Sequence, residues 1–132
     1  MKSLVAEDDA TNRVLLQRYL ARFGECNIAV DGKAAVDEVR YARQAYQSYD
    51  LVCMDLRMPE MDGVQAISEI RKQEASSGSL KSAKIIVTTA HADVDSIKGA
   101  LMGGCNAYLV KPIDTAKLLS ELKNLGLVES GV

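Results

Sequence analysis

The sequence predicts an α/β fold, namely a doubly wound, five-stranded parallel sheet with five helices. Two observations favour it. Five short apolar runs, each bounded by polar residues or glycine, alternate with longer stretches whose apolar residues recur at the spacing of one helix face. The runs show little polar alternation, which is typical of parallel strands buried on both faces. Because parallel neighbours need right-handed crossover connections, the helices are expected on both faces of the sheet.

The first half of the chain carries three expected strands and two expected helices. Short apolar runs predict strands at residues 4–6, 28–30 and 51–54. Between the first two runs, the apolar residues from Leu15 to Phe23 recur on one helix face, and Gly24 is placed to stop that helix. A weaker helical pattern occupies residues 33–47. Its extension from Tyr41 to Tyr49 holds three of the five tyrosines, which indicates either a solvated helix end or a partner surface.

The second half continues the alternation. Apolar runs predict strands at residues 85–87 and 108–110, and helical patterns occupy residues 64–74, 94–102 and 115–125. The last of these helices places four leucines on one side, Leu118, Leu119, Leu122 and Leu125. Residues 75–83, with the sequence ASSGSLKSA, lack apolar periodicity and are interpreted as a flexible connection before the fourth strand.

Length and composition exclude several classes of protein. The chain has 132 residues, which is enough for one hydrophobic core and predicts a single domain over residues 1–132. Apolar residues make up 48% and charged residues 26%, values that exclude a disordered, fibrous or coiled-coil chain. Sixteen Lys and Arg against eighteen Asp and Glu give a net charge of -2. Direct binding to nucleic acid or to an anionic membrane is therefore not expected.

No apolar run approaches the roughly 18 residues of a membrane span, so a cytoplasmic location is expected. Cys26, Cys53 and Cys105 are odd in number and form no C-x-x-C pair, which argues against a disulfide framework or a zinc site. We interpret them as reduced thiols and expect Cys53 in the core.

Polar residues collect directly after four of the five expected strands. In an open α/β sheet, ligands bind outside the carboxyl ends of the strands. The residues at these ends are Glu7, Asp8, Asp9, Asp55, Thr88, Thr89 and Lys111. Each alone has an ordinary explanation; Asp9, for example, is expected as a helix N-cap. Their joint placement at one edge of the sheet favours a functional site.

The expected chemistry of this edge is phosphoryl transfer. If Glu7, Asp8 and Asp55 converge, their charges favour either protonation or a bound cation, and oxygen ligands that leave room for water and phosphate suit Mg²⁺. A carboxylate oxygen of Asp55 can then attack phosphorus. The transferred group needs its equatorial oxygens stabilised, and Lys111 and Thr89 are placed to do so beside the metal.

These residues resemble the receiver domains of bacterial two-component response regulators along essentially the whole chain. Residues 54–63, MDLRMPEMDG, look like the family's phosphoacceptor motif M-D-x-x-M-P-x-M-D-G. The resemblance implies a flavodoxin-like sheet of strand order 2-1-3-4-5. It implies that Asp55 accepts a phosphoryl group from a histidine kinase or histidine phosphotransfer protein. It also implies that Glu7, Asp8, Asp55 and the backbone oxygen of Arg57 hold Mg²⁺ or Mn²⁺.

The resemblance further implies a switch. Thr89, followed by a small residue, matches the switch hydroxyl in preference to Thr88, and Tyr108 matches the aromatic residue that turns inward with it. Lys111-Pro112 matches the phosphate-binding lysine and a proline whose peptide bond is typically cis. Arg57 and His91 occupy positions that tune the lifetime of the phosphoryl group.

The output is expected at the surface of the fourth helix, fifth strand and fifth helix, where an unknown downstream protein binds. Receivers that dimerise through this face to bind DNA often carry Asp-Asp-Tyr before the lysine strand. Here the run is Asn106-Ala107-Tyr108, so a monomer or weak dimer is expected.

Two alternatives remain open. A phosphohydrolase of the haloacid dehalogenase type also forms a phosphoaspartate, but it needs a second Asp two residues after the nucleophile, where this chain has Arg57. A receiver-like adaptor that works without phosphorylation usually lacks members of the acidic set, and all are present here.

Met1 and the short tail at residues 129–132 favour a stand-alone chain over a piece of a hybrid kinase.

Overall fold

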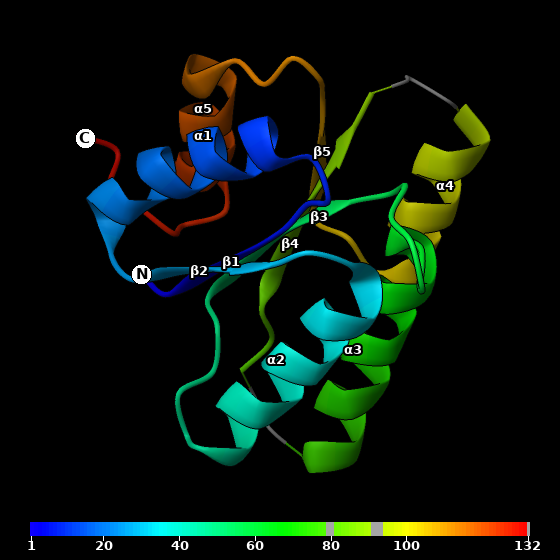
Figure 1. The fold of residues 1–132 in the computed structure, drawn as a ribbon. Helices are drawn as coiled ribbons and strands as arrows, with labels where there is room; N and C mark the ends of the chain where they lie inside the picture. The colour runs from blue at the N-terminus through cyan, green and yellow to red at the C-terminus, as the bar shows by residue number, and fades with distance from the viewer. Residues whose placement is uncertain (79–80, 91–93, 132) are drawn as a thin grey trace.

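The computed structural model describes residues 1–78, 81–90 and 94–131. Five strands alternate with five α-helices, and a short 3₁₀ turn follows the first helix. In chain order these are β1 (Ser3–Ala6), α1 (Ala10–Leu20), η1 (Ala21–Phe23), β2 (Cys26–Ala29), α2 (Gly32–Gln44), β3 (Leu51–Asp55), α3 (Gly63–Ser77), β4 (Lys84–Thr89), α4 (Val94–Gly103), β5 (Ala107–Val110) and α5 (Thr115–Asn124). Every neighbouring pair of strands is parallel, in the order β2-β1-β3-β4-β5 (Figure 1). The predicted fold class and strand order are confirmed.

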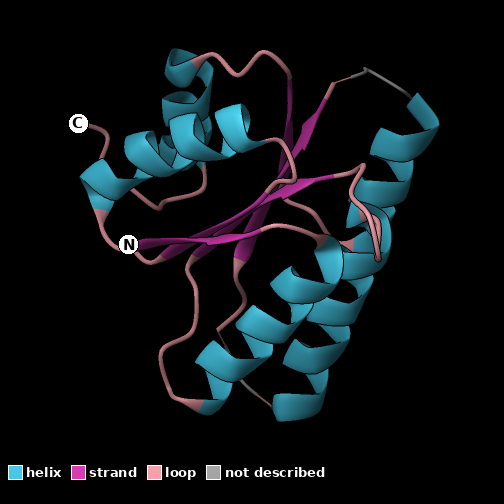
Figure 2. Ribbon diagram, in the orientation of Figure 1, coloured by secondary structure: helices cyan, strands magenta, loops and turns pink. Residues whose placement is uncertain are grey.

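Helices cover both faces of the sheet, with α1 and α5 on one side and α2, α3 and α4 on the other (Figures 1 and 2). Two apolar clusters fill the space between the layers. On the α1 and α5 side, Val5 and Ile86 of the strands pack with Leu20 and Leu118. The cluster on the other side is larger and includes Ile70 of α3. Successive residues of β1, β3 and β4 alternate between the clusters, as the pleat of a strand requires.

Four helices begin at an aspartate that caps the first turn. The side chains of Asp9, Asp31, Asp62 and Asp114 each accept a hydrogen bond from a backbone N–H of the first turn. Such caps satisfy N–H groups that have no partner inside the helix. The expected role of Asp9 is confirmed, because its Oδ1 accepts from the Asn12 N–H at 3.0 Å. These caps fix the residue at which each of the four helices begins.

The edge strands differ from expectation. Burial on both faces was expected for all five strands, yet Ile28 of β2 is 44% exposed and Tyr108 of β5 is also 44% exposed. Both strands have a neighbour on one side only, so part of each remains in contact with solvent. Strand β2 also lies at Cys26–Ala29, earlier than the apolar run at residues 28–30 indicated. Its apolar run extends past the paired segment, and Val30 is half exposed.

Three boundary expectations also need correction. Helix α1 ends at Leu20, and a 3₁₀ turn leads to Gly24, whose φ of 146° is accessible to glycine. Helix α2 ends at Gln44, so the tyrosine-rich extension is helical only as far as that residue; Tyr49 within it is 2% exposed and belongs to the core. Helix α3 continues to Ser77 and ends at Gly78 in the left-handed region, so the first part of the expected flexible connection is helical.

The three cysteines are free thiols, and Cys53 is buried as expected. Its burial raises the pKa of the thiol to about 12. None of the helices in the described ranges is long and apolar enough to cross a membrane.

Candidate functional site

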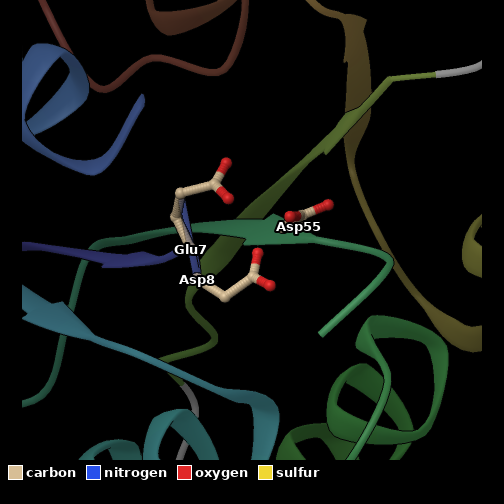
Figure 3. Close-up of side chains that lie close together, drawn as sticks. All are labelled: Glu7, Asp8 and Asp55. Atoms are coloured by element: carbon tan, nitrogen blue, oxygen red, sulfur yellow. The ribbon is translucent and has the colours of Figure 1, made fainter. Parts of the chain in front are cut away.

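Three carboxylates meet at the carboxyl edge of the sheet. Strands β1 and β3 are paired with Ala6 opposite Met54, so the next residues along each strand, Glu7 and Asp55, lie side by side. One carboxylate oxygen from each of Glu7, Asp8 and Asp55 lies within 4.8 Å of the others (Figure 3). Glu7 and Asp55 are buried, whereas Asp8 is exposed. The predicted convergence is confirmed.

Lys111 directly follows the carboxyl end of β5, and its side chain reaches this cluster. Its Nζ lies 2.5 Å from Glu7 Oε1 and donates to Asp55 Oδ2 at 3.2 Å. The contact with Glu7 is a buried ion pair. The Lys111 N–H donates to the Thr89 carbonyl at 2.7 Å, and the Lys111-Pro112 peptide bond is cis, as the resemblance implied.

The electrostatics of the cluster show a deficit of positive charge. Burial raises the pKa of Glu7 above its ordinary value, and Asp55 adds to the rise while Lys111 opposes it. Burial alone would lower the pKa of Lys111, but its contact with Glu7 and the charge of Asp55 outweigh that effect and raise it. Three carboxylates facing one ammonium leave room for a divalent cation, and the all-oxygen donor set fits Mg²⁺.

The remaining predicted residues lie around this centre. Thr88 stands opposite Asp55 in the pairing of β3 with β4, and Thr89 follows as the last residue of β4; both are buried. The Arg57 N–H donates to Asp55 Oδ1 at 3.2 Å, and the Arg57 side chain is exposed. Tyr108 lies further away on the outer strand β5. His91 lies outside the described residues.

Sequence reasoning missed Arg13. Its guanidinium Nη1 donates to the Glu7 carbonyl at 3.1 Å and lies 3.4 Å from the Asp8 carbonyl oxygen. Nothing in the sequence distinguishes it from other charged residues on an exposed helix face, because its partners are backbone atoms of a preceding loop. The contact becomes visible only once the loop and the helix are placed in three dimensions.

A turn and a glycine fix the loop that follows Asp55. The Met61 N–H donates to the Pro59 carbonyl at 2.7 Å across Glu60, which has a φ of 68°. The Gly63 N–H then donates to the Leu56 carbonyl at 2.9 Å. A Cβ atom on Gly63 would lie 2.4 Å from the Asp55 carbonyl oxygen, so only glycine allows α3 to begin this close to the strand.

Gly63→Ala is therefore expected to lower the free energy of unfolding by about 1–3 kcal/mol, because backbone atoms rather than a flexible side chain must move. Gly99→Ala in α4 is the matched control: its new methyl group would meet only the Val64 side chain, at 3.9 Å, and alanine favours a helix. Denaturant unfolding of both variants checks this. If Gly63→Ala and Gly99→Ala have equal free energies of unfolding, the backbone around Gly63 accommodates the added methyl group without a loss of stability.

A doubly wound sheet that carries an acidic triad and a lysine at its carboxyl edge defines a class of phosphoacceptor signalling modules rather than of conventional enzymes. The response regulator receiver domain model matches residues 4–123, and the chain belongs to this family. Receiver domains accept phosphoryl groups in two-component signalling.

Relatives agree with this assignment. The sensory/regulatory protein RpfC of Xanthomonas campestris pv. campestris is 33% identical over 127 residues, which cover 96% of this chain and 17% of that protein. The chain thus spans about a sixth of the length of this curated relative. Relatives such as the osmosensing histidine protein kinase SLN1 of Saccharomyces cerevisiae, 35% identical over 120 residues, are also much longer, since the match covers 89% of this chain and 9% of SLN1.

Solved structures give the same result. The receiver domain of the sensor histidine kinase PA1611 from Pseudomonas aeruginosa superposes with a TM-score of 0.78 at 32% identity, over 95% of this chain and 97% of that one. That structure has a magnesium ion coordinated in its active-site cleft. The receiver domain of Ssk1 from Saccharomyces cerevisiae, solved with the histidine phosphotransfer protein Ypd1, gives 0.80 at 27% identity over 96% and 89% of the two chains.

Proposed function

We propose that this chain is a phosphorylation-dependent switch in which Asp55 accepts the phosphoryl group. The observation that carries the proposal is the convergence of Glu7, Asp8 and Asp55 at the carboxyl edge of the sheet, where Lys111 contacts Glu7 and Asp55. An oxygen of Asp55 forms a bond to phosphorus while the bond from phosphorus to the donor breaks. Because Lys111 Nζ already lies 3.2 Å from Asp55 Oδ2, it is placed to pair with the incoming phosphoryl oxygens.

We further propose that Glu7, Asp8, Asp55 and the backbone oxygen of Arg57 hold Mg²⁺, or Mn²⁺ in its place. The bound cation would offset the negative charge of the carboxylates and of the phosphoryl oxygens. Of the three carboxylates, Asp8 is the exposed one and is open to a solvated ion. The absence of a carboxylate at position 57 argues against the phosphohydrolase alternative, and the complete acidic set argues against the unphosphorylated adaptor.

The switch that we propose follows from charge. An acyl phosphate adds close to two negative charges to an acidic pocket, so nearby donors must rearrange to pair with it. Thr89, buried at the end of β4, would move its hydroxyl to the phosphoryl group, and Tyr108 would turn inward from the outer strand. Arg57 and His91 would tune how fast water removes the phosphoryl group.

The output surface that we propose is the face formed by α4, β5 and α5. A groove of about 580 Å³ lies there, lined by residues that include Leu101, Tyr108, Lys117 and Glu121. Movement of Tyr108 would change its shape and so the affinity for a downstream protein. Residues 1–132 would act as one receiver domain, as a monomer or weak dimer, and the cytoplasmic location stays a prediction.

The phosphoryl donor that we propose is a histidine kinase or a histidine phosphotransfer protein. Two likenesses support this: the Ssk1 receiver was solved with such a phosphotransfer protein, and several relatives are histidine kinases.

Phosphorylation by a small donor tests the proposal. With Mg²⁺ and acetyl phosphate, the wild-type chain is expected to gain one phosphoryl group by intact-mass spectrometry, and Asp55→Asn none. Asp62→Asn is the matched control, since Asn still caps α3 and this carboxylate lies outside the cluster. Phosphoryl uptake by Asp55→Asn, or its loss in Asp62→Asn alone, would contradict the assignment.

A further inference from the structure

The Arg13 side chain folds back from α1 over the loop that carries Glu7 and Asp8. Its Nη1 donates to the Glu7 carbonyl at 3.1 Å and lies 3.4 Å from the Asp8 carbonyl oxygen. Helix α1 provides a fixed base for this contact, because Asp9 caps it and the Arg13 N–H donates to the Asp9 carbonyl at 2.9 Å. Arg13 therefore ties the backbone of the loop to a rigid helix.

The Asp8 carboxylate depends on this backbone for its direction. Within the described ranges, that carboxylate accepts no hydrogen bond, and it is exposed. The peptide groups on both sides of Asp8 are nevertheless fixed. Arg13 contacts both of their carbonyls, and the Asp9 N–H donates to Glu7 Oε2 at 3.1 Å. The loop geometry thus fixes the backbone position from which the Asp8 side chain extends toward Glu7 and Asp55.

We propose that Arg13 is a positioning residue of the metal site, which holds the two peptide groups flanking Asp8 so that its carboxylate faces Glu7 and Asp55 before a cation binds. This inference rests on the proposed Mg²⁺-dependent function. A ligand that is already in place loses less conformational freedom on binding. Groups that orient a metal ligand without touching the metal contribute about 10- to 100-fold to affinity.

The charge of Arg13 acts in the opposite direction. A guanidinium close to a cation site repels the cation, so charge alone predicts that a neutral replacement binds Mg²⁺ more tightly. Positioning predicts weaker binding after the same replacement. The sign of the change in Mg²⁺ affinity therefore separates the two effects without any assumption about their size.

Arg13→Met removes the donor and the charge while keeping a long side chain. Calorimetric titration of the purified chain with MgCl₂ is expected to give about 10-fold weaker binding than wild type. Arg18→Met is the matched control, because Arg18 is an exposed arginine on the same helix and its loss changes the net charge equally. Its affinity should be unchanged or slightly higher. Arg13→Lys, which keeps a charged donor, should recover part of the loss.

Two further measurements separate positioning from a loss of stability. In the absence of metal, amide exchange at Asp9 should be faster in Arg13→Met than in wild type, at equal free energy of unfolding. With acetyl phosphate, the half-saturating Mg²⁺ concentration should rise about 10-fold, while the rate at saturating Mg²⁺ stays within about twofold. A lower saturating rate with an unchanged Mg²⁺ midpoint would contradict a positioning role.

The outcomes distinguish this inference from the function on which it rests. If wild type binds no Mg²⁺, the proposed function fails. If wild type binds Mg²⁺ and Arg13→Met binds it equally or more tightly, only the role of Arg13 is overturned. Should Arg13→Met fail to fold, Arg13→Gln takes its place in the same measurements with the same expected sign.

Discussion

Glu74→Leu is expected to lower the free energy of unfolding by about 3–5 kcal/mol, which is the usual cost of removing one partner from a buried ion pair. The Glu74 side chain is 6% exposed and accepts from Arg71 Nη1 at 2.7 Å and from Arg43 Nη2 at 3.4 Å. It also accepts from the Ala83 N–H at 2.8 Å. Replacement by leucine would leave two guanidinium groups and one backbone N–H without this partner.

The position of Arg71 explains why the effect should be large. Its Nε and Nη2 donate to the Gly104 carbonyl at 3.0 and 2.8 Å, and Nη2 also donates to Asn106 Oδ1 at 3.1 Å. Asn106 Oδ1 in turn accepts from the Ile85 N–H at 2.8 Å. Glu74 and Arg71 thus connect α3 to the start of β4 and to the turn between α4 and β5.

Denaturant unfolding measures the effect, and Glu69→Leu on the same helix is the matched control. Glu69 is partly exposed and pairs with Lys72 at 3.6 Å on the surface, where an ion pair contributes about 0–1 kcal/mol. A loss of stability in Glu74→Leu no larger than that in Glu69→Leu would show that the buried cluster contributes little beyond a surface pair.

The Glu74 cluster marks a limit of sequence reasoning. Residues 75–83 are polar and aperiodic, and they predict a flexible connection after α3. The structure instead extends α3 to Ser77 and ties Ala83 to Glu74. A buried charge looks like a solvated one in a sequence, because burial depends on partners that lie far apart along the chain. Arg71 and Asn106, for example, are 35 positions apart.

The strands and the acidic site were predictable for a physical reason. A parallel sheet brings the carboxyl ends of its strands to one edge, so Glu7 and Asp55 could be placed together without knowledge of any side-chain contact. Edge exposure was not predictable from apolar runs alone, since Ile28 of the edge strand β2 is as apolar as residues of the central strands. The contact of Arg13 with two carbonyls depends on a loop conformation that no residue pattern records.

Mg²⁺ is expected to stabilise the wild-type chain, and Asp8→Asn is expected to remove most of that gain. A ligand at about 100 times its dissociation constant adds about 2.7 kcal/mol to the free energy of unfolding when it binds only the folded state. Loss of the Asp8 carboxylate removes one charged oxygen donor from a cluster whose other two carboxylates already face Lys111. The same substitution relieves repulsion among like charges, so without metal Asp8→Asn should be more stable than wild type.

The size of that second effect should be small, because Asp8 is exposed and charges about 4 Å apart in water interact by about 1 kcal/mol. Denaturant unfolding with and without MgCl₂ measures both effects. Asp9→Asn is the matched control, since Asn still caps α1 and Asp9 is not a member of the acidic cluster. If Mg²⁺ stabilised Asp8→Asn and Asp9→Asn equally, Asp8 would not be a ligand, and the cation would have to bind through Glu7, Asp55 and the backbone oxygen of Arg57. The expected result is instead that Asp8→Asn is less stable than wild type with Mg²⁺ and more stable without it. That result would show that the exposed Asp8 carboxylate serves cation binding and lowers the stability of the metal-free fold.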